Sequence, residues 1–105
     1  ETEQVFIHDR IFTYMAELAA ATRTHPMLEL GLSPRGTLAL AKMSKAAAFL
    51  NGRNYVTPAD VVFIFKDVAL HRIRLSSKAR VSRVTADAVA DSVLEQVDRP
   101  TPKRL

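Results

Sequence analysis

The feature that most constrains the fold of this chain is a predicted helix that is apolar on nearly every side. Ser33 is its expected N-cap, Pro34 its first residue, and Gly52 provides a stop just after its last residue, at about Asn51. Its main face is expected to contain Gly36, Ala39, Leu40, Met43, Ala47 and Leu50, with Leu38 and Phe49 on the far side. Such a helix is typical of the centre of a bundle.

Two of the three other predicted helices have a single apolar stripe. The first runs from about Asp9 to Arg23, and its stripe weakens in the last turn, where Thr22 takes the next apolar position. The fourth begins after Thr85 as the N-cap and keeps apolar residues on one face as far as Val97.

The third predicted helix has the clearest start signal. Thr57 is the N-cap, Pro58 takes the first position, and Asp60 is the acid of a capping box. The run that follows, at 61–65, is β-branched and aromatic, which is also compatible with a strand. The caps and the apolar spacing favour the helix, and the strand stays as the alternative.

Together these segments predict a small all-α bundle of about four main helices. It is expected to occupy residues 1–98, followed by a flexible tail at 99–105 that contains two prolines. The chain begins with Glu rather than Met, so we expect it to be a piece of a longer protein.

The composition excludes several classes of function. The chain has no Cys, so disulfides, zinc ribbons and thiol catalysis are excluded. No apolar stretch approaches the ~18–20 residues of a membrane span. Its three glycines begin no phosphate loop, and its three histidines lack metal-ligand spacing, so no metal site is expected. No catalytic set can be singled out, and the chain by itself is expected to be catalytically inert.

The net charge of +4 is unevenly distributed. No acidic residue occurs from Val68 to Ala86, and this stretch contains Arg72, Arg74, Lys78, Arg80 and Arg83. It is either a solvated basic connector or a docking surface for an acidic partner or domain. On the second interpretation, an alternative function is a free-standing helical binding module, for example for nucleic acid, that uses the segment Arg72 to Arg83.

Arg35 is the most unusual residue, because it lies in the first turn of the second predicted helix. Unpaired N–H groups and the positive end of the helix dipole make a cation unfavourable there. A phosphate would neutralise both the arginine and the helix end. Alternatively, Arg35 bonds to solvent or to a nearby carboxylate such as Glu29.

Four strings in order, ATRTHP, LGLSPRGTLAL, KAAAFLNGRNYVTPADV and HRIRL, resemble the C-terminal helical lid of MoxR-type AAA+ ATPases. The resemblance covers roughly Val5 to Pro100. One departure is Gly36, where the family commonly has Ala, and glycine there is expected to loosen the turn by up to ~1 kcal/mol.

The resemblance implies roles for several residues. Arg35 would be the sensor 2 arginine, which contacts the γ-phosphate of ATP, and Ser33 and Pro34 would position it. Four other matched residues would close helices or lie at an interface: Arg23, His25, His71 and Arg72. Arg53 is expected to be free for solvent or an ion pair.

The resemblance also implies the setting. The parent protein would hydrolyse ATP with Mg²⁺ through an upstream AAA+ large domain, in a cytoplasmic hexameric ring. The lid would close over the nucleotide, and the ring would act in a chaperone-like way on proteins with von Willebrand factor A domains. No nucleotide is expected on this fragment alone, and nucleic acid and membrane are not expected partners.

Overall fold

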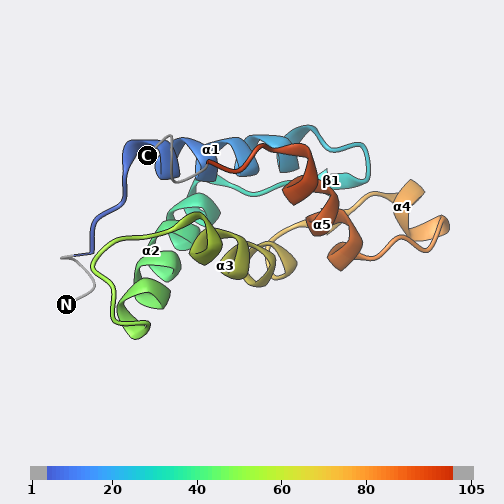
Figure 1. The fold of residues 1–105 in the computed structure, drawn as a ribbon. Helices are drawn as coiled ribbons and strands as arrows, with labels where there is room; N and C mark the ends of the chain where they lie inside the picture. The colour runs from blue at the N-terminus through green and yellow to red at the C-terminus, as the bar shows by residue number, and fades with distance from the viewer. Residues whose placement is uncertain (1–4, 101–105) are drawn as a thin grey trace.

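Helices dominate the computed structural model, which describes residues 5–100 (Figure 1). The elements in chain order are α1 (Asp9–Thr24), β1 (Leu28–Leu30), α2 (Pro34–Leu50), α3 (Pro58–Leu70), β2 (Arg74–Leu75), α4 (Ser77–Val81) and α5 (Ala86–Gln96). The all-α prediction is confirmed. The short helix α4 and the two strands were not predicted, and most of the predicted tail at 99–105 lies outside the described residues.

The predicted helix starts are confirmed by their caps. The Ser33 side chain accepts a hydrogen bond from the Gly36 N–H at the start of α2. At the start of α3, Thr57 and Asp60 form the expected reciprocal capping box. Residues 61–65 are helical, so the strand alternative is wrong: the capped start and the packing of one apolar face outweigh β propensity.

The buried face of α2 differs from the predicted one. Its buried residues are Gly36, Leu40, Ser44 and Ala48, spaced four apart. Two residues of the expected face are exposed, Met43 at 41% and Leu50 at 83%. The small side chains of this row let α1 and α3 approach α2 closely, and this decides which side is covered. Large apolar side chains on other sides of α2, among them Leu38 and Phe49, stay exposed among residues 5–100.

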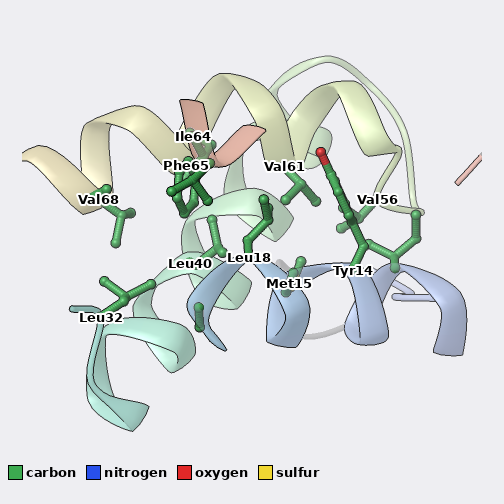
Figure 2. Close-up of a cluster of buried hydrophobic side chains, with 14 of the residues drawn as sticks. Tyr14, Met15, Leu18, Leu32, Leu40, Val56, Val61, Ile64, Phe65 and Val68 are labelled. Atoms are coloured by element: carbon green, nitrogen blue, oxygen red, sulfur yellow. The ribbon is translucent and has the colours of Figure 1, made fainter. Parts of the chain in front are cut away.

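The core lies between α1, α2 and α3, with α5 closing one side. Figure 2 shows Tyr14, Met15 and Leu18 of α1 directed towards α3, which contributes Val61 and Phe65 to the same cluster. Each fully buried side chain of this size contributes about 1.5–3 kcal/mol to folding. None of the helices that the structure describes combines the length and apolar character of a membrane span.

Contacts between distant segments hold the ends of the bundle. Strands β1 and β2 pair antiparallel, with Leu28 opposite Leu75. Lys66 of α3 forms ion pairs with Asp87 and Asp91 of α5, at 3.0 and 3.1 Å. After α5 the chain turns back over α1 (Figure 1). These links place the end of α1, the start of α2 and the end of α3 close together.

Candidate functional site

The loop that leads into α2 is fixed to the last turns of α1 through Leu32. The Leu32 N–H donates to Thr22 Oγ1 at 2.8 Å, and the Thr22 hydroxyl donates to the Ala19 carbonyl at 2.6 Å. The Leu32 carbonyl accepts from Arg23 Nε at 2.7 Å. Because the Leu32 side chain is also fully buried, both its backbone and its side chain are held. Ser33, the N-cap of α2, follows Leu32 directly, so the start of α2 is held in position.

Gly31 allows this loop to approach α1. A Cβ atom at this position would lie 2.7 Å from the Cα and backbone N of Arg23, closer than real side chains come. Only glycine fits such a backbone contact. The sequence gives no sign of this contact, since Gly31 by itself predicts only a turn.

Arg35 projects from the first turn of α2, where it is exposed. This first turn contains no acidic residue. Within residues 5–100, Arg35 takes part in none of the hydrogen bonds or ion pairs between side chains. Glu29 is instead bonded to Arg74 and Arg80, at 3.4 and 3.7 Å. The alternative that Glu29 neutralises Arg35 is therefore wrong.

Gly36 is buried in the same turn, under two side chains. A Cβ atom there would lie 2.6 Å from Leu32 Cδ1 and 3.2 Å from Arg72 Cδ. The stem of Arg72 thus crosses the first turn of α2, although the two residues are far apart in sequence. The loosening expected from glycine is opposed by this packing and by the bond from the Gly36 N–H to Ser33 Oγ at 3.1 Å.

His25 and His71, two of the predicted interface residues, bond to neighbouring groups within the described chain. His25 Nδ1 accepts from the Met27 N–H at 3.1 Å, so Nε2 carries the proton and faces Ser92 Oγ of α5 at 3.4 Å. His71 Nδ1 lies 2.8 Å from the Asp67 carbonyl at the end of α3, which requires a proton on that nitrogen. These contacts close α1 and α3. That Arg23, His25, His71 and Arg72 also lie at an interface with another domain stays a prediction.

Arg53 forms the ion pair that the sequence left open. Its two terminal nitrogens donate to the Asp60 carboxylate at 2.7 and 3.0 Å. Asp60 is 6% exposed and also accepts from the Thr57 N–H at 2.8 Å. The pair fixes the start of α3 rather than contributing to the surface around Arg35.

An apolar groove runs between α1 and α2 and reaches the anchored loop. Its volume is about 680 Å³, and its lining includes Phe12, Met15, Leu38, and Arg23 beside Pro34 at the loop end. The guanidinium of Arg35 carries only hydrogen-bond donors, which suit an anion. Among residues 5–100, no three His, Asp or Glu side chains gather in a way that would hold a metal ion.

Fold and site together define a helical lid domain, a small bundle that presents an arginine at an exposed helix start. The family model described as the AAA lid domain matches residues 20–93, and the chain belongs to this family. Within it, the chain is a lid domain of the MoxR type.

Three similar proteins support this assignment. Protein YeaC of Bacillus subtilis is 34% identical over 98% of this chain and 32% of its own length. Chaperone MoxR1 of Mycobacterium tuberculosis is 30% identical over 90% of this chain and 28% of its own length. A crystal structure assigned as an ATPase, from Cytophaga hutchinsonii, superposes with a TM-score of 0.89 at 28% identity, over 95% of this chain and 33% of that one. The chain thus spans about a third of the length of the relatives it matches.

Proposed function

We propose that this chain is the lid of a MoxR-type AAA+ ATPase and closes over ATP held by a large domain of the same parent protein. Arg35 is the sensor 2 residue, and its guanidinium contacts the γ-phosphate. The resemblance of the SPR string and the lid fold supports this role. The name of one similar protein, a chaperone, and the description of another as an ATPase support the assignment of the parent protein to this class.

The observation that carries the proposal is a cation without a carboxylate at a firmly anchored helix start. In α1, the corresponding arginine, Arg10, follows Asp9, whose charge suits the dipole. In α2 no acid accompanies Arg35, so the guanidinium is available to an anion, which the positive end of the helix dipole also favours. The bonds of Thr22 and Arg23 to Leu32 fix the start of this helix. Such a preorganised cation stabilises charge on a phosphate without reorganisation.

The uncovered apolar surface of α2 and α3 supports an assembled parent. Large apolar side chains that are 41–83% exposed follow the two helices: Leu38, Met43, Phe49, Leu50 and Phe63. Met43, Leu50 and Phe63 line one apolar pocket between the two helices, and exposed apolar patches of this kind are characteristic of protein interfaces. We propose that the large domain of the parent and a neighbouring subunit cover it in a hexameric ring.

The remaining parts of the mechanism belong to the parent. Its large domain supplies the phosphate loop, the acid that holds Mg²⁺ and the residue that orients the attacking water. Lid movement after hydrolysis then changes the contact with the next subunit. The parent acts in the cytoplasm, in a chaperone-like way, on proteins with von Willebrand factor A domains.

The test is the change Arg35→Ala in the full-length parent. ATP turnover is expected to fall by at least about tenfold, as for the loss of other preorganised donors. Arg10→Ala is the matched control, because it removes an exposed arginine from the same position in the first turn of α1. Arg35→Lys keeps the positive charge but lacks the planar guanidinium, and we expect its ATP turnover to lie between that of Arg35→Ala and that of the unchanged protein. Unchanged ATP turnover in Arg35→Ala would show that Arg35 is not a sensor 2 residue.

A further inference from the structure

We propose that the segment around α4 is a docking surface for an acidic segment of another protein. This surface, called the basic tip below, consists of Arg74, Lys78, Arg80 and Arg83 with Val81 among them. All five residues are exposed. The proposal concerns a separate surface and does not depend on the role of Arg35.

The basic tip lies at one end of the molecule. Figure 1 shows α4 beyond β1 and α5, well away from the start of α2. A partner on the basic tip would therefore leave the surface around Arg35 accessible.

The charges of the basic tip are poorly balanced within the described chain. Glu29 is the one carboxylate that pairs with it, and this single group faces both Arg74 and Arg80, at 3.4 and 3.7 Å. Both pairs are solvent-exposed, with about half or more of each side chain accessible. Exposed pairs of this kind are weak and are readily exchanged for other carboxylates. Lys78 and Arg83 have no carboxylate partner within residues 5–100.

Arg83 occupies a backbone position that normally belongs to glycine. Its φ angle is 62°, and it follows the C-cap of α4. The Arg83 N–H bonds to the Arg80 carbonyl and the Val84 N–H to the Ala79 carbonyl, which is the Schellman pattern. A left-handed conformation is unfavourable for a residue with a Cβ atom. The Arg83 side chain thus leaves the end of α4 from a backbone conformation that few side chains adopt.

The apolar content of the basic tip favours a protein over a nucleic acid. Val81 is 83% exposed between the cations, and Leu30 of the neighbouring strand β1 is 53% exposed. These side chains suit an apolar residue flanked by carboxylates. The segment 72–84 contains no aromatic residue on which a base could stack. The expected occupant is thus an acidic stretch of protein with at least one apolar side chain.

The test uses the full-length protein that contains this chain and a fluorescein-labelled peptide of alternating Asp and Glu with one central Leu. Fluorescence anisotropy is expected to show binding at low salt that weakens as salt rises. The double variant Lys78→Gln/Arg83→Gln is expected to weaken binding by at least about tenfold, since it removes both unpaired cations. Val81→Ser is expected to weaken binding of this peptide but not of the same peptide with Ala in place of Leu.

The control is Lys42→Gln/Lys45→Gln, which removes the same charge from α2. It is expected to bind the peptide as the unchanged protein does, and thermal unfolding of each variant verifies that the fold is kept. Equal loss in both double variants would mean that only net charge matters, and would overturn the proposal. So would absence of peptide binding, or tighter binding of a duplex oligonucleotide that is lost in Lys78→Gln/Arg83→Gln.

Discussion

The bond between Thr22 and Leu32 gives the sharpest test of how the start of α2 is held. Thr22 is 2% exposed, and its hydroxyl is the partner of the Leu32 N–H. The change Thr22→Val keeps the size and β-branched shape of the side chain but removes this acceptor. The Ala19 carbonyl loses a donor as well, although it remains part of the helix.

The magnitude follows from the burial of the Leu32 N–H. A buried donor without a partner costs about 1–3 kcal/mol. The additional buried methyl group offsets up to ~0.8 kcal/mol of this, and Thr and Val have similar helix propensities. We therefore expect the free energy of unfolding to fall by about 1–2 kcal/mol, in the range set by these terms.

Urea unfolding followed by circular dichroism measures this loss, with an unchanged slope against urea. Thr24→Val is the matched control, because Thr24 is exposed and its bond to the Ala21 carbonyl is long, at 3.4 Å. It should change stability by less than about 0.5 kcal/mol. The full-length parent with Thr22→Val should also lose ATP turnover. Equal stability of the two variants would refute the view that Thr22 anchors the loop.

Three further predictions concern the core and the start of α3. Ser44 Oγ is buried without a hydrogen-bond partner among the described residues, so Ser44→Ala should raise the free energy of unfolding by about 1 kcal/mol in urea titrations; a loss would mean that the hydroxyl has a partner. Arg53→Lys cannot bond to both oxygens of Asp60 and should cost about 1–2 kcal/mol in thermal unfolding, whereas no change would show that one bond suffices. Burial raises the pKa of Tyr14 above its ordinary 10.0, so its contribution to stability is complete below pH 10.0 and is lost as pH rises through the raised pKa. Tyr14→Phe should therefore lose less stability than the unchanged chain between neutral pH and pH values above 10.0, and parallel losses would contradict this.

Much of the helical framework could be predicted from sequence because its signals are local. The caps at Ser33, Thr57 and Thr85 predicted the starts of α2, α3 and α5. The strands and α4 escaped prediction because they are only two to five residues long, too short for a period. Strands β1 and β2 form only because they pair with each other, although they lie far apart in the sequence.

The candidate site divides in the same way. The position of Arg35 in a first turn could be predicted, since it needs only the neighbouring Ser and Pro. The face of α2 that is buried could not, because hydrophobicity alone ranks Met43 above Ser44. Close approach of α1 and α3 selects the row of small residues instead.

The sequence by itself determined where the helices begin, the all-α class and the resemblance to a lid, because caps, periodicity and ordered motifs depend on neighbouring residues. Only the tertiary structure decided which groups hold the start of α2. Thr22, Arg23 and Arg72 reach it from other elements. Burial of the Leu32 backbone makes those contacts necessary, since a buried N–H or carbonyl must find a partner wherever the fold provides one.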